Sequence, residues 1–544
     1  MLSGLLDRLV PVTGFYLLAL WATWQLQYIT SALPAFVVAF LATVWMLTTS
    51  IYHVRMERRI DALGGHAPAI ETWSPGNFLL LIEAVRKVLQ HRNHEWWWNN
   101  FAQVASTSNP TPWTFEAVTI GQRVLLTADE ENIKAILATQ FHDFGKGEEF
   151  RKYWKDFLGY SIFTTDGELW HNSRQLLRPQ FVKDRVSDLH TFEKHIQPLL
   201  SHLAGTHDGA TIKIDDLFFR FALDAATDFL LGSSVESLSN PQVRFADAFA
   251  HVQYIQSIIA RAGPLASLVP KKEQKKQLKI IDEFINQFIE QALQLSPEEL
   301  EKKSKSDEGY TFLHAIASYT RDRKVLRDQL IAVLLAGRDT TASMLSWLFY
   351  ELSRKPEVVE KLRKEIISYV GSDRSPTYAD LKSMRYLQHA LNEVMRMYPA
   401  VPFNVRISLK DTTLPRGGGP DGTQPIGVPE GTPVGYSPLI LHRRADIYPP
   451  TSETFPDPDT FVPERWDHWT PKSWTYIPFN GGPRICIGQQ FALAEMAYTV
   501  VRIFQTFQRL ECRTPEFPML RSEIVIQPAH GVYVAFHKGG KAQQ

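Results

Sequence analysis

One of the two cysteines in this 544-residue chain stands in a setting that would activate a thiol. Cys486 lies in the stretch FNGGPRICIGQQF, and the residues after it have the apolar spacing of a helix. A helix N-terminus favours a thiolate, because its free N–H groups and its dipole stabilise negative charge. The nearby Gly481, Gly482 and Gly488 allow close approaches that a side chain would block. The pattern predicts a thiolate that acts as a ligand or as a nucleophile.

Arg484, two residues before the cysteine, adds a cation that can pair with an acidic group on whatever the sulfur binds. A thiolate in a glycine loop beside an arginine suits ligation of a haem iron, with the arginine on a propionate. A catalytic cysteine nucleophile is the alternative, but no local signature of a cysteine hydrolase accompanies Cys486. The other cysteine, Cys512, has no comparable neighbours and is interpreted as a packing residue.

A second chemically unusual stretch is LLAGRDTTAS, which lies inside a predicted helix from Lys324 to Arg354. Gly337, Asp339 and Thr340 are all poor helix formers, so local helix stability does not explain their presence. Their position in the middle of a helix therefore indicates a role other than helix formation. For this motif alone, the alternative is a hydroxyl bonded to a helix carbonyl.

The composition limits the kind of protein that carries these motifs. The chain is 44% hydrophobic and 21% charged, with 58 basic and 58 acidic residues, which is typical of a globular protein with a large core. No basic run stands out, so no partnership with nucleic acid is expected. Two cysteines are too few for a disulfide framework or a four-cysteine metal site and are consistent with a reducing compartment.

Beyond residue 54 the pattern is mainly helical, without internal repeats or a flexible linker, which predicts one large domain over 55–544. The segment from 414 to 434 is dense in glycine and proline and is expected to form turns and short strands. Its glycines do not precede the Gly-Lys-Ser/Thr of a phosphate-binding loop.

The N-terminus differs from the rest, because no charged residue lies between Arg8 and Arg55. It contains two apolar stretches, Leu9 to Trp24 and Ala32 to Tyr52, and the second reaches the roughly 20 residues that a membrane-spanning helix needs. We expect residues 1–54 to form a membrane anchor with one or two segments. The arginines that follow favour a cytoplasmic location for the remainder. The alternative is a buried helix hairpin.

The residues from Phe479 to Gly488 match every fixed position of the Phe-x-x-Gly-x-Arg-x-Cys-x-Gly signature, so the chain resembles the cytochrome P450 enzymes, the haem-thiolate monooxygenases. This resemblance implies a mainly α fold with small β-sheets, and haem b with Cys486 as the axial iron ligand. It also implies that the predicted helix crosses the haem face, where Gly337 loosens a turn for dioxygen while Asp339 and Thr340 deliver protons.

Further positions match family motifs in the family's order. Trp170 and Arg174, one helical turn apart, and Arg406 correspond to contacts of the haem propionates. Ala336 stands where animal fatty-acid ω-hydroxylases can carry a glutamate bonded to haem, so the haem here is expected to be non-covalent. The resemblance also implies a buried structural ion-pair cluster, whose members are Glu393, Arg396 and Arg465.

The implied reaction inserts one oxygen atom from O2 into a C–H bond of a lipophilic substrate. Electrons are expected from a separate NADPH-cytochrome P450 reductase, with cytochrome b5 as a further candidate donor. The expected location is the endoplasmic reticulum membrane, with the catalytic domain facing the cytoplasm. A haem-thiolate isomerase or dehydratase of hydroperoxides is a remote alternative, since such proteins commonly lose the helix threonine that is present here as Thr340.

The segments expected over the haem are apolar, which suits a lipophilic substrate. The candidate substrate-binding residues are Phe163, Val333, Val401, Phe403, Ile524 and Val525. The stretches FGKGEEFRKYWKDFLGYSIFTTDGELW and WHNSRQLLRPQF resemble the fungal alkane and fatty-acid hydroxylases, which implies terminal hydroxylation of long chains. A tailoring monooxygenase of a fungal polyketide or terpenoid pathway is the alternative.

Overall fold

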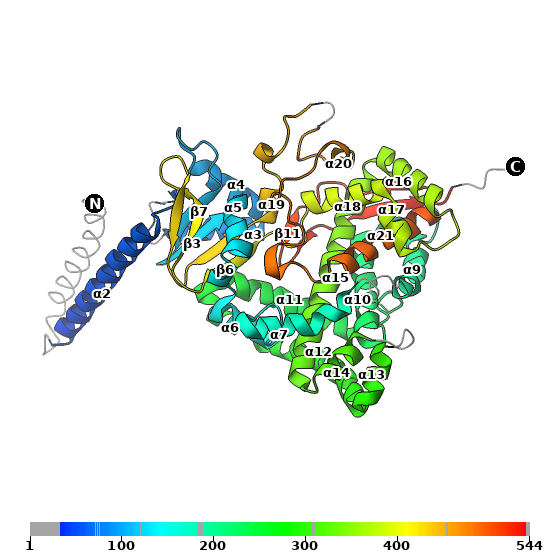
Figure 1. Cartoon of the computed structure of the whole chain (residues 1–544), viewed down its shortest axis with the longest axis horizontal. Helices are drawn as coiled ribbons and strands as arrows, with labels where there is room; N and C mark the ends of the chain where they lie inside the picture. Colours follow the sequence, from blue (N-terminus) through cyan, green and yellow to red (C-terminus); the bar gives the residue numbers. More distant parts are fainter. Residues whose placement is uncertain are drawn as a thin grey trace, which may run out of the picture.

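The computed structural model of the chain describes residues 33–539, except 71, 73, 75–76, 120, 183–188, 241, 306–310 and 453–454. Figure 1 shows a helical body on one side, a strand-rich region beside it, and helix α2 (Leu33–Leu63) projecting away from the strand-rich region. The expected mainly helical fold with small sheets is confirmed.

The helices after α2 fall into two groups along the chain. Those before the central helix are α3 (Phe78–Leu89), α4 (Asn93–Gln103), α5 (Glu130–Lys134), α6 (Gly147–Leu158), α7 (Gly167–Leu177), α9 (His190–Leu203), α10 (Ile214–Leu231), α11 (Arg244–Ala262), α12 (Lys272–Gln294), α13 (Pro297–Lys305) and α14 (Phe312–Tyr319). The rest are α15 (Arg323–Ser353), α16 (Pro356–Tyr369), α17 (Tyr378–Ser383), α18 (Arg385–Met397), α19 (Pro438–Leu441), α20 (Arg465–His468) and α21 (Gln489–Thr506).

The strands pair into one larger and three small sheets. The six-stranded sheet has the order β1 (Ala69–Ile70), β2 (Thr114–Thr119), β3 (Gln122–Thr127), β9 (Pro433–Tyr436), β6 (Asn404–Ser408) and β4 (Phe144–Gly145). The small sheets are β10 (Arg509–Cys512) with β13 (Tyr533–His537) and β5 (Thr211–Lys213), β11 (Leu520–Ser522) with β12 (Ile526–Pro528), and β7 (Thr412–Gly418) with β8 (Gln424–Val428). The predicted strands in the segment 414–434 are therefore present.

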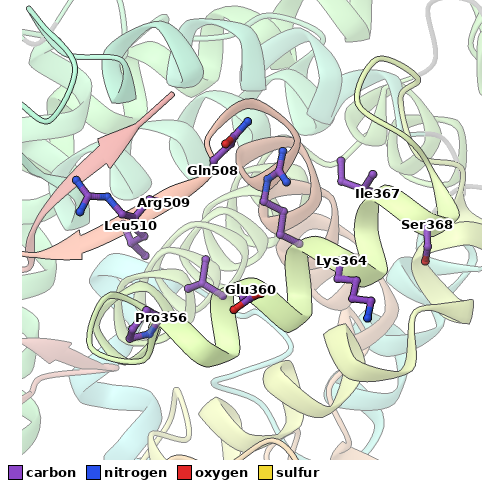
Figure 2. A pocket seen from close by; sticks show the side chains of 10 residues that line it. Pro356, Glu360, Lys364, Ile367, Ser368, Gln508, Arg509 and Leu510 are labelled. Atoms are coloured by element: carbon purple, nitrogen blue, oxygen red, sulfur yellow. The ribbon is translucent and has the colours of Figure 1, made fainter. Parts of the chain in front are cut away.

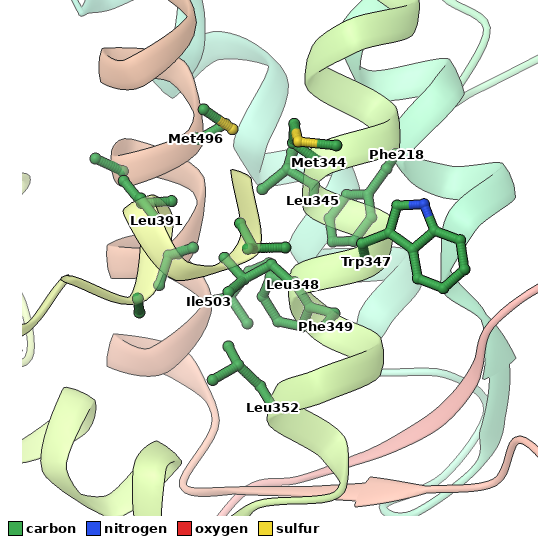
Figure 3. Close-up of a cluster of buried hydrophobic side chains, with 14 of the residues drawn as sticks. Phe218, Met344, Leu345, Trp347, Leu348, Phe349, Leu352, Leu391, Met496 and Ile503 are labelled. Carbon is green, nitrogen blue, oxygen red and sulfur yellow. The ribbon is translucent and has the colours of Figure 1, made fainter. Parts of the chain in front are cut away.

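Helix α15 forms the centre of the helical body. The Asp322 side chain caps its first turn by accepting from the Lys324 and Val325 N–H groups, and the helix ends before Pro356, close to the expected bounds. Its second half is buried on every side, and Figure 3 shows how its apolar side chains meet those of α10, α18 and α21. The labelled members of this core are Phe218, Met344, Leu345, Trp347, Leu348, Phe349, Leu352, Leu391, Met496 and Ile503.

The structure describes only part of residues 1–54, which we expect to form a membrane anchor. The apolar stretch Leu9–Trp24 lies outside the described residues, whereas most of the second stretch forms the first half of α2. Phe40 and Trp45 there are each 67% exposed, so the alternative of a buried hairpin is wrong for this half. Among the helices whose residues the structure describes, none is both long and apolar enough to cross a membrane.

Candidate functional site

The loop before α21 presents Cys486 at a tightly constrained position. The Cys486 N–H donates to the Phe479 carbonyl at 3.0 Å, which closes the loop on itself. Gly482 has φ +64°, and a Cβ there would lie 1.9 Å from the Leu137 carbonyl oxygen, so only glycine fits. Helix α21 begins at Gln489, so Cys486 lies just before the helix N-terminus and not within the first turn.

The Cys486 side chain has an exposed surface, while the rest of the thiol is close to other protein atoms. This burial among protein atoms raises the pKa of its thiol, whereas the Gly488 backbone N–H and the charge of Arg174 lower it. Arg174 on α7 also donates to the Ile485 carbonyl at 3.0 Å, next to the sulfur. A bound metal ion would deprotonate such a thiol outright.

Arg484 is fixed beside this thiol by several partners. Its guanidinium donates to Asp166 at 2.7 Å and to the Thr165 carbonyl at 2.8 Å, and it lies 4.7 Å from the centroid of the Trp170 ring. Burial lowers the pKa of Arg484 to about 10, and the nearby positive charge of Arg406 adds to this effect. Its Nε is buried without a hydrogen-bond partner. The site therefore retains a capacity to donate to a further acceptor.

Three further basic side chains, those of Lys146, Arg174 and Arg406, lie in the same region. Burial and the charges of Arg406 and Arg484 hold the pKa of Lys146 well below its ordinary value. Among the described residues, none of Lys146, Arg174 and Arg406 forms an ion pair, whereas Arg484 has Asp166. This excess of positive charge beside an accessible thiol fits a ligand that carries two carboxylates. A haem with its two propionates meets that requirement.

Helix α15 has one open stripe on its surface. Within residues 328–353, every residue is buried except Val333, Ala336, Gly337 and Thr340, which recur at the spacing i, i+3, i+4 and i+7 of one helix face. A Cβ on Gly337 would have no atom within 4 Å. Four of the predicted haem, oxygen and substrate residues thus share the part of α15 that borders open space.

Thr340 and Asp339, which are neighbours on α15, have different hydrogen-bond partners. The Thr340 hydroxyl donates to the Ala336 carbonyl at 2.7 Å, which is the helix bond considered as the alternative role for this residue. The Asp339 carboxyl accepts from Arg338 at 3.2 Å and from Gln253 of α11. Burial raises the pKa of Asp339, and these two donors oppose that shift. A carboxyl with a raised pKa is suited to carrying a proton.

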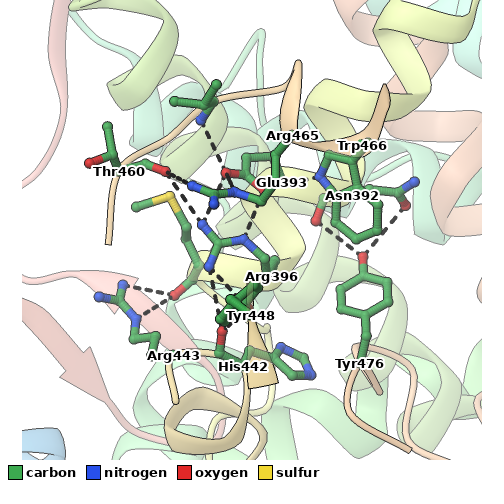
Figure 4. A network of polar contacts seen from close by, with 12 residues as sticks. Asn392, Glu393, Arg396, His442, Arg443, Tyr448, Thr460, Arg465, Trp466 and Tyr476 are labelled. Carbon is green, nitrogen blue, oxygen red and sulfur yellow. Dashed lines mark hydrogen bonds and ion pairs between the residues drawn. The ribbon is translucent and has the colours of Figure 1, made fainter. Parts of the chain in front are cut away.

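The three residues expected to form a structural cluster, Glu393, Arg396 and Arg465, do meet (Figure 4). Glu393 accepts two bonds from Arg396, at 2.8 and 2.9 Å, and one from Arg465 at 3.2 Å, with all three side chains fully buried. The Val462 N–H and the Trp466 indole donate to the same carboxylate, each at 3.0 Å. Burial opposes the charge of Arg396, yet Glu393 raises its pKa above the ordinary value.

The candidate substrate residues divide into accessible and occupied positions. Phe163 and Val401 are 38% and 37% exposed, and Ile524 is partly buried in the same apolar cluster as Val333. Phe403 instead stacks on Trp97 with ring centroids 5.3 Å apart. Val525 is 2% exposed and so offers almost no surface to a ligand.

Sequence reasoning missed three residues that organise the site, namely Lys146, Asp166 and Gln253. Lys146 lies in the stretch FGKGE, and its backbone N–H and that of Gly147 bind Asp166 at 2.8 Å each. Gln253 reaches Asp339 from a different helix. The glycines on both sides of Lys146 were the one visible signal, because they indicate a constrained backbone.

A surface recess of about 550 Å³ lies between α16 and the start of β10, as Figure 2 shows. Its lining includes Glu360, Lys364 and Arg509. None of the candidate site residues belongs to this lining, so the recess has no part in the site around Cys486.

Comparison with known proteins identifies the family. The family model for cytochrome P450 matches residues 81–535. The chain is 48% identical over 523 residues to the cytochrome P450 monooxygenase pvhE of Talaromyces variabilis, covering 93% of this chain and 96% of that protein. It is 42% identical to cytochrome P450 52A1 of Candida tropicalis, covering 79% of this chain and 81% of that protein. It is 37% identical to the cytochrome P450 monooxygenase fsdH of Fusarium heterosporum, covering 96% and 91%.

The fold and the site define a haem-thiolate protein. The chain belongs to the cytochrome P450 family, and it is a cytochrome P450 monooxygenase. Its cofactor is haem with a cysteine thiolate as axial ligand, and its reaction requires O2, a substrate and a redox partner. The remote alternative of an isomerase that does not use O2 finds no support in these relatives.

Proposed function

We propose that Cys486 is the axial ligand and that Arg484, Arg406, Arg174 and Lys146 bind the haem propionates. The accessible thiol and the unpaired cations support this assignment. Trp170 contributes by holding Arg484 against its ring at 4.7 Å, and Phe479 by accepting the Cys486 N–H. When bound, the thiolate-ligated haem supplies the activation of O2.

The chain's own residues would orient the substrate and move protons. The buried Asp339 carboxyl, whose pKa is raised, would supply a proton, and the Thr340 hydroxyl would pass it towards the open space at Gly337. The apolar stripe of α15 and the accessible Phe163 and Val401 would exclude water and position a C–H bond.

The substrate class is a long-chain lipophile, and the reaction is terminal hydroxylation of a fatty acid or alkane. The observation that carries the function is the open stripe of α15, which has an apolar residue at Val333 and a hydroxyl at Thr340. Such a site is apolar, with a few placed polar groups, which suits a lipophilic ligand. Similarity to cytochrome P450 52A1 along most of both chains is consistent with the resemblance to the hydroxylase branch.

The test is turnover of the purified holoenzyme reconstituted with NADPH-cytochrome P450 reductase, with and without cytochrome b5. Fatty acids and alkanes should yield products hydroxylated at the terminal carbon, and only when O2, NADPH and the reductase are all present. Terpenoid and polyketide substrates form the second arm of the panel. Oxidation confined to that arm would replace the lipid assignment by the tailoring function.

We further propose that the N-terminus attaches the enzyme to the endoplasmic reticulum membrane, with the catalytic domain on the cytoplasmic side. The absence of charge from 9 to 54 supports this, as do the exposed apolar side chains of α2 such as Phe40 and Trp45. The full chain should sediment with microsomes, whereas a variant lacking residues 1–54 should be released by high salt. Equal release of both would contradict the anchor.

A further inference from the structure

Arg261 lies in the last turn of α11, outside the proposed haem-binding region. No acidic side chain pairs with it among the described residues. Its guanidinium donates to the Ser522 carbonyl on β11 and lies 3.5 Å from the Ser257 hydroxyl. The side chain is exposed, and partial burial by neighbouring protein lowers its pKa.

An apolar path leads along α11 to this cation. Tyr254, Ile258 and Arg261 recur at i, i+4 and i+7, which places them on one helix face. Tyr254 and Ile258 are 54% and 37% exposed, so this face has no apolar cover of its own. Ile524, in the turn between β11 and β12, packs in the same apolar cluster as Val333 of α15. The hairpin bound by Arg261 also contacts α15, because the Ser343 hydroxyl donates to the Ile526 carbonyl on β12.

The position of Arg261 along α11 sets the length of a ligand that could use it. Gln253 of α11 bonds Asp339 on α15, so this level of α11 lies beside the proton-delivering residues. Arg261 is eight residues further along the helix, which corresponds to about 12 Å at 1.5 Å per residue. An extended acyl chain can bridge such a separation.

A second guanidinium on the same hairpin, that of Arg521 on β11, is already engaged. Arg521 lies 3.6 Å from Glu523 and also donates to the Gln527 side chain. Glu523 raises the pKa of Arg261 through space, but no oxygen of Glu523 pairs with it. An incoming carboxylate would therefore find its free charge partner at Arg261.

We propose that Arg261 binds the carboxylate of a fatty-acid substrate, whose chain lies along Ile258 and Tyr254 towards the α15 stripe. This assignment rests on the proposed lipid hydroxylation and names its substrate as the free acid. The carboxylate end is held away from Thr340, so the opposite end of the chain reaches the site of oxidation. The Arg261 contact thereby selects the terminal carbons.

The test measures binding of a saturated fatty acid and of the primary alcohol of equal chain length to the full-length holoenzyme by calorimetry and by the haem absorbance change. Arg261→Gln should weaken binding of the acid about tenfold or more, because a charge-assisted hydrogen bond is lost. Binding of the alcohol should not change. Arg261→Lys should retain most of the acid affinity. Arg321→Gln is the matched control, since Arg321 is also exposed and bonds backbone carbonyls, of Leu293 and Leu295.

Each other outcome has a definite meaning. Unchanged acid affinity in Arg261→Gln overturns the inference and leaves lipid hydroxylation standing. Equal weakening of acid and alcohol also overturns it, because the arginine would then act only by holding the β11–β12 hairpin. If the unaltered enzyme binds neither ligand, the proposed lipid function fails together with the inference.

Discussion

At the scale of single residues, Asp339 and Thr340 are neighbours in sequence but face different surroundings. Asp339 is 3% exposed and is held by Arg338 and by Gln253 of α11, whereas Thr340 lies on the open stripe of α15. The Thr340 hydroxyl bonds the Ala336 carbonyl, so its oxygen is fixed in orientation and can still accept a proton. In the proposed proton delivery, the carboxyl supplies a proton that the hydroxyl passes on.

Thr340→Ala removes this hydroxyl without opening the core, because position 340 borders open space. Haem content should remain normal, while product formed per NADPH consumed falls and hydrogen peroxide is released. The loss expected for a proton-transfer group is about a hundredfold or more in coupled turnover. Thr340→Ser keeps the hydroxyl and should restore coupling. Tight coupling in Thr340→Ala would remove the proton-delivery role.

Glu495 of α21 is a buried carboxyl that sequence reasoning did not single out. It is 2% exposed, and burial raises its pKa to about 8, with a bond from Thr341 acting in the opposite direction. Between pH 4.5 and 8 the folded chain keeps this proton while the unfolded chain loses it. The unfolded state therefore becomes relatively more favourable as the pH rises through this window.

Glu495→Gln should abolish that part of the pH dependence. Relative to the unaltered enzyme, the variant should gain stability steadily from pH 5 to pH 8, and the two should converge near pH 4.5. Urea unfolding at several pH values measures the difference. A constant difference across this range would show that the carboxyl ionises alike in both states.

At the scale of elements, the Glu393 carboxylate joins helix α18 to the start of α20, which is distant in sequence. Glu393 binds Arg396 on its own helix and Arg465 at the start of α20, and every member is fully buried (Figure 4). The Arg465 guanidinium also donates to the Pro456 and Asp457 carbonyls. The segment from Pro456 to the start of α20 is thereby fastened to α18.

Glu393→Gln should destabilise the fold by about 3–5 kcal/mol, because it leaves two buried guanidinium groups without a counter-charge. Chemical denaturation of the holoenzyme measures this loss. Asp467→Asn is the matched control, since it removes an exposed pair with Arg385 at 2.8 Å and should cost less than about 1 kcal/mol. Equal stability of the two variants would contradict a structural role for Glu393.

The elements that could be predicted from sequence are those whose signals are local. The bounds of α15 follow from the Asp322 cap and from Pro356. The Cys486 loop follows from the glycines beside the cysteine. The stripe at Val333, Ala336, Gly337 and Thr340 is also readable, because helical period alone places those residues on one face.

At the scale of the whole molecule, the site depends on partners that no local pattern identifies. Lys146 follows β4, Arg406 lies on β6 and Arg484 precedes α21, and only the folded chain brings their charges together. Asp166 binds both Arg484 and the backbone at Lys146, so one carboxylate links two of these segments. Periodicity and spacing describe single elements and carry no information on such contacts.

The central claim is that the Cys486 thiolate holds haem iron in this fold. The most direct measurement is the absorbance spectrum of the reduced carbon monoxide complex for the unaltered enzyme and for Cys486→Ala and Cys512→Ala. Cys512 is the only other cysteine and lies on β10, with its Sγ 3.7 Å from the Thr514 carbonyl oxygen. We predict that Cys486→Ala loses the red-shifted Soret band of a thiolate-ligated haem and that Cys512→Ala keeps it. An unchanged band in Cys486→Ala would contradict the account.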